Sequence, residues 1–429
     1  MQPRFTLRRT SAVLRLYAQR LAAFQPNARL YLASVVLSGA AMGVYRLLFN
    51  FYVLSRGLDQ AILGMLVTAS SLTALLAALP MGYLADRLGR KPSLILGYLL
   101  TAATVALVVL VPSVSVLLLA NILMGLGQSL SGVTSGPFLM ENSGEEERTY
   151  LFSFSSGLMM ASAFVGNWIG GYLPTWMGAL QGVPATSTAA YGASLLVIAF
   201  ASLGATLPLT FLKPIRTNTP RSGFASLAYI RQNAGLFSRL IVPMLATSIG
   251  AGMFMPFMNV FFRQVHHQPD PVIGTLFAWG SLAMGAGLMI APPLAERYGK
   301  IELVVITQAL SIPFLAVLGF APWFVVSAGA YFIRLALMNM SGPVYQTFVM
   351  EHCEPQARAT VASLVSMANN FGWAFSPIIS GWLQKHYGFH PPFLITLILY
   401  TLSTYLYWAF FWKGREQARE PAPASLQGD

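Results

Sequence analysis

Gly82-Tyr-Leu-Ala-Asp86-Arg87-Leu-Gly89-Arg90-Lys91-Pro92 separates a long apolar run that ends at Gly82 from another that begins at Leu94. A turn this short between two membrane-length runs predicts a close antiparallel pair of helices. We expect Gly82 and Gly89 to allow close backbone approach, and Gly89 to take a positive φ after the first helix. Asp86 is placed to accept hydrogen bonds from a helix start or an arginine. The three bases of the turn are costly in lipid and favour a cytoplasmic position.

The segment resembles the loop between helices 2 and 3 of the major facilitator superfamily, whose pattern is roughly G-x-L-a-D-r-x-G-r-k. The matching residues are Gly82, Asp86, Arg87, Gly89, Arg90 and Lys91. The resemblance implies an all-α membrane protein of 12 transmembrane helices, built as two six-helix bundles. Such bundles rock around a substrate site at their interface, a mechanism known as alternating access.

The composition independently indicates a polytopic membrane protein. The chain has 429 residues, of which 55% are hydrophobic and 9% charged, with a mean hydropathy of +0.62; soluble domains are about 25% charged. The single cysteine, Cys353, excludes an intrachain disulfide and a cysteine-cluster metal site. The sequence contains no metalloprotease, P-loop or Rossmann fingerprint. We therefore expect no enzymatic activity, no cofactor and no metal, and any transport must be driven by gradients.

Twelve apolar runs are each long enough to cross a hydrocarbon core of about 30 Å. They lie near 30–54, 61–85, 92–111, 115–140, 150–174, 189–212, 240–263, 272–295, 301–320, 323–350, 359–384 and 392–412. The predicted domains are a basic segment at 1–29, a bundle at 30–212, a linker with an amphipathic helix at 213–239, a bundle at 240–412 and a tail at 413–429.

The basic residues predict the orientation of the chain. With both termini inside, 21 of the 26 lysines and arginines are cytoplasmic and only Arg56, Arg263 and Lys385 are external. The net charge of +12 is then an inner-leaflet feature, which favours anionic headgroups and not nucleic acid as the partner. Residues 4–23 fit a basic amphipathic helix on that surface, and a transit peptide is the alternative. We expect a monomer in the cell membrane.

The chain repeats itself at a constant offset of 210 residues. The repeated pairs include Gly64 and Gly274, Asp86 and Glu296, Arg87 and Arg297, Gly89 and Gly299, Arg90 and Lys300, Glu141 and Glu351, Arg148 and Arg358, and Gly171 and Gly381. Six helices per repeat return the chain to its starting side, so the two halves have parallel topology.

Charged residues at the predicted inner helix ends are candidates for a gate. With Gly82 and Gly89, they are Asp86, Arg87, Arg90, Glu141, Arg148, Glu296, Arg297, Glu351 and Arg358. The spacing of Glu141 and Arg148, and of Glu351 and Arg358, resembles a signature of several branches of the superfamily. We expect a network that closes the inner gate; the alternative is solvated interfacial charges worth about 0–1 kcal/mol each.

Polar residues at membrane depth are the candidates for substrate contact. On the helices that line the cavity in the resembling family they are Arg46, Asn50, Asn121, Gln128, Asn259, Arg334 and Asn339. Arg46 and Arg334 both lie about 25 Å above the inner edge, at 1.5 Å of helix rise per residue. No acid is available at that depth, so two guanidiniums at one level favour a ligand anion. Bonds to carbonyls or neighbouring helices, and snorkelling of Arg334, are the alternatives.

These observations predict a secondary transporter of a small organic solute, anionic or zwitterionic. A multidrug exporter is one alternative, although Asn167 replaces the proline in a helix 5 antiporter pattern. A sensor or scaffold that kept the fold without transport is another. No acid lies in the middle of a predicted helix. We therefore expect uniport, exchange, or coupling through a proton on the substrate itself.

Overall fold

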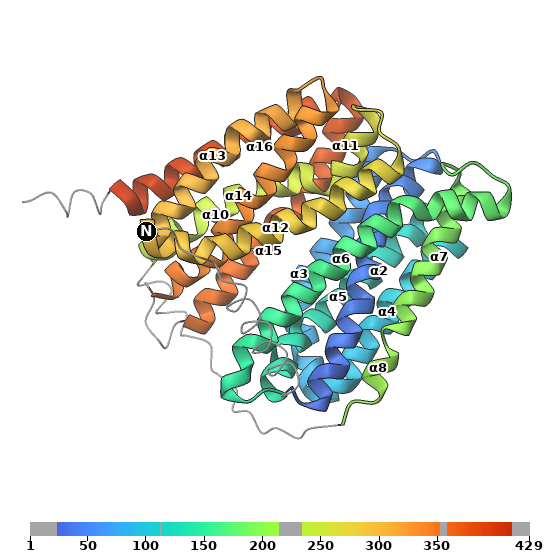
Figure 1. Ribbon diagram of the computed structural model, residues 1–429, viewed down its shortest axis with the longest axis horizontal. Coiled ribbons are helices and arrows are strands. Elements are labelled where there is room, and N and C mark those ends of the chain that lie inside the picture. Colours follow the sequence, from blue (N-terminus) through green and yellow to red (C-terminus); the bar gives the residue numbers. More distant parts are fainter. Residues whose placement is uncertain (1–23, 112, 214–233, 352–357, 414–429) are drawn as a thin grey trace, which may run out of the picture.

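The computed structural model describes residues 24–111, 113–213, 234–351 and 358–413, and these residues form helices and contain no strand. Figure 1 shows two bundles of helices inclined to one another. The predicted amphipathic helix at 4–23, most of the linker, Cys353 and almost all of the tail lie outside the described residues.

The first bundle contains α2 (Pro26–Ser55), α3 (Gln60–Leu88), α4 (Arg90–Leu110), α5 (Val114–Glu141), α6 (Glu145–Gln181), α7 (Thr188–Gly204) and the short α8 (Leu207–Thr210). The second contains α10 (Ala234–Phe254), the 3₁₀ turn η1 (Met255–Phe257), α11 (Met258–Gln264), α12 (Asp270–Tyr298), α13 (Lys300–Phe320), α14 (Phe324–Glu351), α15 (Arg358–Tyr387), α16 (His390–Tyr407) and the π-helical turn η2 (Trp408–Trp412).

Two of the predicted helices are interrupted. The run at 240–263 breaks at η1, where Pro256 cannot donate a backbone hydrogen bond, and continues as α11. The run at 189–212 divides into α7 and α8 just before Pro208. Side-chain caps stabilise the N-termini of several other helices. Asp59, for example, accepts a hydrogen bond of 3.0 Å from the Ile62 N–H and caps the N-terminus of α3.

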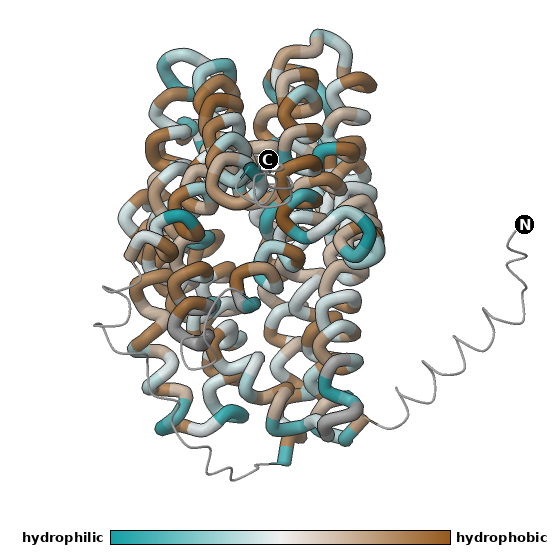
Figure 2. Tube along the Cα trace, turned by 90° about the vertical axis from the view of Figure 1, so that its left-hand side faces the viewer, coloured by the Kyte–Doolittle hydropathy of each residue, from teal (hydrophilic) through white to brown (hydrophobic). Residues whose placement is uncertain are grey.

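Ten of the described helical segments are long and apolar enough to cross a membrane. The other two long helices, α6 with 37 residues and α15 with 30, are less apolar. Helix α6 packs on α2 and α12, and α15 packs on α3 and α10, so each contacts both bundles. Their position between the bundles explains their polarity, because they face less lipid than the outer helices do. Hydrophobic residues are distributed along the helices of the molecule (Figure 2).

The sequence repeat is visible in the backbone. A single glycine joins α3 to α4 and another joins α12 to α13, with φ of +88° at Gly89 and +101° at Gly299. The positive φ predicted for Gly89 is confirmed. The close approach predicted for Gly82 and Gly89 is wrong in this conformation, because a Cβ added at either position would meet nothing within 4 Å. The two bundles diverge at the end of the molecule that carries the turn at Gly89 (Figure 1). No backbone of the other bundle therefore lies against Gly82.

Repeat-related glycines also form two close crossings between the bundles. A Cβ on Gly64 of α3 would lie 3.2 Å from the Gly381 Cα of α15, and one on Gly171 of α6 would lie 3.1 Å from the Gly274 Cα of α12. Each crossing therefore joins positions that the 210-residue offset exchanges, as a pseudo-two-fold axis between the bundles requires. Both crossings lie toward the end where α2 gives way to α3, which we call the closed end. The end that carries the turns at Gly89 and Gly299 is the open end.

Candidate functional site

Two asparagines, one from each bundle, form hydrogen bonds between the bundles, nearer the middle of the helices than the closed end. The Asn50 Nδ2 of α2 donates to the Asn259 Oδ1 of α11 and to the Pro256 carbonyl, both at 2.7 Å. The Asn259 Nδ2 donates in turn to the Leu47 carbonyl of α2, also at 2.7 Å. The Pro256 carbonyl lies in η1, where the regular pattern of helix bonds is interrupted. The broken helix thus supplies an acceptor that an unbroken helix would have used internally.

Arg46 lies one turn before Asn50 on the same face of α2, toward the space between the bundles. Its immediate neighbours, Tyr45 and Leu47, are buried, but Arg46 itself is exposed. Among the described residues no hydrogen bond, ion pair or ring contact engages its guanidinium. A cation in the middle of a membrane-length helix therefore lies at an exposed position between the bundles, and no carboxylate of the described residues pairs with it.

Arg334 of α14 does not face the space between the bundles, although the sequence predicted that it lines the cavity at the level of Arg46. It is only 2% exposed, and its Nη2 donates to the Tyr400 hydroxyl at 3.0 Å. Its guanidinium carbon lies 4.5 Å from the centre of the Phe254 ring, and its Nε has no partner among the described residues. Helices α10 and α16 enclose the cation inside the second bundle, which their aromatic rings make favourable.

Three amides complete the predicted set. Asn121 is buried and donates to the Leu117 carbonyl at 2.8 Å, and Asn339 donates to the Leu335 carbonyl at the same distance. Both bonds return to the preceding turn of the same helix, so these side chains join no other element. Gln128 of α5 is half-buried, and its side-chain amide has no hydrogen bond within the described part of the chain; only its main-chain carbonyl accepts one, from Ser131. Of the predicted amides, Gln128 is the one whose side chain makes no hydrogen bond to the described residues.

A second contact between the bundles was not anticipated from the sequence. Asp270, at the first position of α12, is 5% exposed and forms an ion pair with Arg263 of α11. Tyr191, from α7 of the other bundle, donates its hydroxyl to the Asp270 Oδ2 at 2.6 Å and accepts a hydrogen bond from Arg263. The guanidinium carbon of Arg263 also lies 3.8 Å from the centre of the Phe51 ring of α2. The first bundle thus clasps an ion pair of the second, an arrangement that we call the closed-end clasp.

Exposed polar pairs surround the clasp. The Lys385 Nζ of α15 lies 2.7 Å from the Asp59 Oδ2, and the Gln60 Nε2 donates to the Gln264 Oε1 at 3.0 Å. The hydrogen bond from Lys385 is the main cause that lowers the pKa of Asp59 below its ordinary value. Every polar contact between the bundles that joins described residues lies from the middle of the helices to the closed end.

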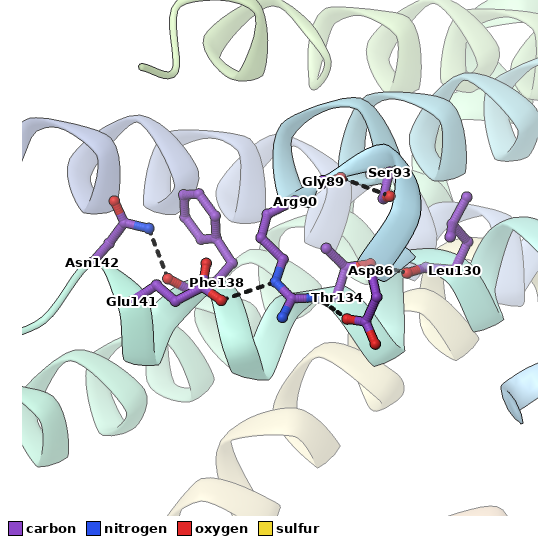
Figure 3. A network of polar contacts seen from close by, with 9 residues as sticks. All are labelled: Asp86, Gly89, Arg90, Ser93, Leu130, Thr134, Phe138, Glu141 and Asn142. Carbon is purple, nitrogen blue, oxygen red and sulfur yellow. Dashed lines mark hydrogen bonds and ion pairs between the residues drawn. The ribbon is translucent and has the colours of Figure 1, made fainter. Parts of the chain in front are cut away.

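The charges at the open end form ion pairs within each bundle. In the first bundle Arg90 of α4 donates to Asp86 of α3 at 2.9 Å and to Glu141 of α5 at 3.0 Å (Figure 3). The Asp86 side chain is 53% exposed and that of Glu141 is 7% exposed. In the second bundle Lys300 pairs with Glu351, the two repeat equivalents of Arg90 and Glu141. Within the described residues these ion pairs do not link one bundle to the other.

The remaining predicted gate residues stay outside these networks. The Nε of Arg148 is buried without a partner among the described residues, and the side chain of Arg358 lies outside them. Glu296 is exposed, Arg87 lies over the ring of Tyr83 one helical turn earlier, and Arg297 lies over the ring of the adjacent Tyr298. Lys91, expected as an interfacial charge, donates to the Thr210 and Leu212 carbonyls at 2.5 and 2.9 Å. It therefore caps the end of α8.

Comparison with known proteins assigns the family. The model of the Major Facilitator Superfamily matches residues 31–272 and 240–428. A multidrug resistance protein, MdtG of Dickeya zeae (strain Ech586), is 23% identical over 381 residues, which cover 86% of this chain and 91% of that protein.

Solved transporters share the fold at lower identity. A bacterial homologue of the human lysosomal transporter Spinster, in an inward-facing and occupied conformation, gives a TM-score of 0.77 at 13% identity, covering 94% of this chain and 100% of that one. The nucleoside transporter NupG gives 0.73 at 16% identity, with 91% and 99% covered. A D-xylose-proton symporter gives 0.68 at 16% identity, with 90% and 97% covered.

Proposed function

This chain belongs to the Major Facilitator Superfamily of multi-pass membrane transporters, and we propose that its cargo is a small organic anion or zwitterion. The observation that carries the proposal is Arg46, an exposed and unpaired guanidinium between the bundles, one turn from the asparagines that close the passage. A passage that ends at such a cation favours a ligand that carries a compensating negative charge.

The energetics of charge burial support an anionic ligand. An uncompensated cation at membrane depth is costly, and the described residues supply Arg46 with no carboxylate. A carboxylate or phosphate accepts two parallel, charge-assisted hydrogen bonds from a guanidinium and also neutralises its charge, which a neutral sugar or an amine cannot do. Gln128 offers a free amide that suits the polar remainder of the same molecule. We assign Arg46 as the anchor of the site and leave Arg334 as an internal support of the second bundle.

The conformation supports alternating access with the open end in the cytoplasm. The basic residues of the sequence predict that the turn at 82–92 is cytoplasmic, and the bundles diverge at this end (Figure 1). Arg90 and Lys300 are satisfied within their own bundles here. We propose that the open-end charges exchange these partners for ones on the other bundle when the passage closes. The closed-end clasp opens in the same step.

The acidic residues favour uniport, exchange, or a proton carried by the substrate. Asp270 is the most buried of the described carboxylates, and it is already engaged by Arg263 and Tyr191 at the closed end. A carboxylate held in this way stabilises the seal. It does not meet the substrate beside Arg46, because the Asn50 and Asn259 pair lies between them along α2 and α11.

A binding experiment tests the proposal. The full-length protein and its Arg46→Gln, Arg46→Lys and Lys413→Gln variants are titrated with a library of carboxylates, phosphates and matched neutral compounds. We expect an anion whose affinity falls about tenfold to a hundredfold in Arg46→Gln, since a hydrogen bond to a charged group contributes about 1.5–3 kcal/mol. Lys413→Gln removes a charge at an exposed open-end position and should leave that affinity unchanged. Equal affinities in wild type and Arg46→Gln would refute the anion site.

Export of lipophilic compounds is the second candidate, and the similarity to MdtG is the observation that favours it. The same variants separate the two functions, because a lipophilic cation gains nothing from Arg46. Counterflow in proteoliposomes of such a compound, at a rate unchanged or increased in Arg46→Gln, would support export. Counterflow of an anion that Arg46→Gln abolishes would support the first proposal.

A further inference from the structure

A cavity unrelated to the passage between the bundles lies at the closed end of the first bundle. Its volume is about 380 Å³, and its walls come from the ends of α2, α4 and α6 and from the start of α7. The residues that matter for its chemistry are Tyr52, Arg56, Val109, Gln181, Thr188 and Leu196. None of the lining residues is acidic. A cavity of this size accommodates a small polar group with part of an attached chain.

Arg56 gives the cavity a positive charge, and no ion pair among the described residues compensates it. It follows the last residue of α2, and its guanidinium carbon lies 5.7 Å from the centre of the Tyr52 ring. Its Nη1 is buried and has no hydrogen-bond partner among the described residues. Orphaned guanidinium nitrogens are unfavourable unless a ligand or water engages the group. The positive charge of Arg56 therefore favours an anionic ligand in the cavity.

The start of α7 adds donors of the same kind. Thr188 and Ala189, the first two residues of this 17-residue helix, line the cavity. The Ser187 hydroxyl accepts a hydrogen bond from the Ala190 N–H. The N–H groups of Thr188 and Ala189 lie in the first turn of the helix, where no carbonyl of the same helix can accept from them. The positive end of the helix dipole thus reinforces Arg56. The Gln181 side chain, from the end of α6, adds a polar group at the exposed rim.

The opposite wall is apolar and faces the membrane. Val109 of α4 and Leu196 of α7 line it. Their sequence neighbours Leu110 and Val197 are 67% and 42% exposed. Arg56, at the end of a membrane-length helix, lies where phosphate groups of a bilayer are found. A cationic pocket that opens along an apolar helix surface matches an amphiphile, with the anionic head in the pocket and the chain along α4 and α7.

We propose that this cavity binds the phosphate headgroup of a membrane phospholipid. The lipid would fasten the end of α2 to the start of α7, two segments that also supply Phe51 and Tyr191 to the closed-end clasp. The site needs no assumption about substrate or orientation, because phosphate groups line both faces of a bilayer.

Native mass spectrometry of the full-length protein tests the site, with phosphatidylglycerol as the probe. We expect Arg56→Gln to weaken lipid binding about tenfold, because it removes the charge. Ala193→Leu should weaken it similarly by filling the cavity that Ala193 lines, and it tests the proposal even if Arg56→Gln fails to fold. The control Lys413→Gln, which removes a charge at the other end of the molecule, should bind as wild type does.

Two outcomes would overturn the proposal. Wild-type lipid affinity in both Arg56→Gln and Ala193→Leu would show that the cavity is not the binding site. Soluble glycerol phosphate that displaces the lipid at equal molar concentration would show that the pocket takes a free anion and that the apolar wall contributes nothing.

Discussion

Tyr191→Phe should shift the chain toward a conformation that is open at the clasp. The hydroxyl of Tyr191 belongs to the first bundle and its acceptor, the buried Asp270 carboxylate, belongs to the second, 2.6 Å away. The bond therefore exists only while the closed end is closed, and its loss destabilises that state alone. The substituted ring can keep its packing against Phe51, whose centre lies 6.1 Å away.

The magnitude follows from the charge of the acceptor. A hydrogen bond to an ionised group contributes about 1.5–3 kcal/mol, and about 1.4 kcal/mol corresponds to a tenfold change in an equilibrium constant. The ratio of clasp-open to clasp-closed molecules should rise about tenfold to a hundredfold. Asp270→Asn should act in the same direction, because it leaves the Arg263 cation without its counter-charge.

Double electron–electron resonance between two spin labels measures the ratio of clasp-open to clasp-closed molecules. The labels are attached at Thr186→Cys and Val265→Cys, which are exposed on opposite bundles, in a Cys353→Ser background. We expect the longer-distance fraction to grow in Tyr191→Phe and to stay at the wild-type level in the control Tyr405→Phe, whose ring is 58% exposed. An unchanged distance distribution in both Tyr191→Phe and Asp270→Asn would refute the clasp.

Three further predictions concern the open-end turn and the exposed polar pair. Asp86→Asn should slow counterflow in proteoliposomes several-fold while the free energy of unfolding changes by less than about 1 kcal/mol, because the carboxylate is 53% exposed. The pKa of Asp59 is lowered from its ordinary 3.8 by Lys385, so this ion pair stabilises the fold at every pH above that value and is lost only as the pH falls through the lowered pKa. The difference in melting temperature between wild type and Lys385→Gln should therefore be constant from pH 8 to about pH 5 and shrink only below the ordinary pKa of Asp59. Gly89→Ala should destabilise the protein by about 1–3 kcal/mol in thermal unfolding, because its φ of +88° and ψ of 163° suit glycine alone.

Each of these has a contrary result. Wild-type counterflow in Asp86→Asn would remove this residue from the gate, and a melting difference that vanishes near neutral pH would contradict the Asp59 assignment. For the turn, Gly82→Ala is the matched control: it lies inside α3 with open space around its Cβ position, so alanine should be neutral or slightly stabilising. Equal melting temperatures for Gly82→Ala and Gly89→Ala would contradict the role of the positive φ.

The sequence by itself determined the features that depend on local order along the chain. Hydrophobic run lengths predicted the helices, and the offset of 210 residues predicted two equivalent bundles. The glycine at position 89 predicted a left-handed backbone because no other residue adopts it cheaply between two helices. The pairing of Asp86 with Arg90 also followed from the short turn between two helices, whereas Glu141, at the far end of α5, reaches Arg90 because α5 packs on α3 and α4.

Only the tertiary structure decided which polar groups are free. Arg46 and Arg334 look alike in the sequence, as lone bases at the same depth, yet one is exposed between the bundles and the other is 2% exposed. The difference comes from Tyr400, which lies 66 residues from Arg334 along the chain, and from the Phe254 ring of α10. Burial and hydrogen-bond partners are set by which helices pack together and by how they rotate about their axes. Hydrophobic runs in a membrane protein leave both undetermined, because lipid-facing and helix-facing surfaces are equally apolar.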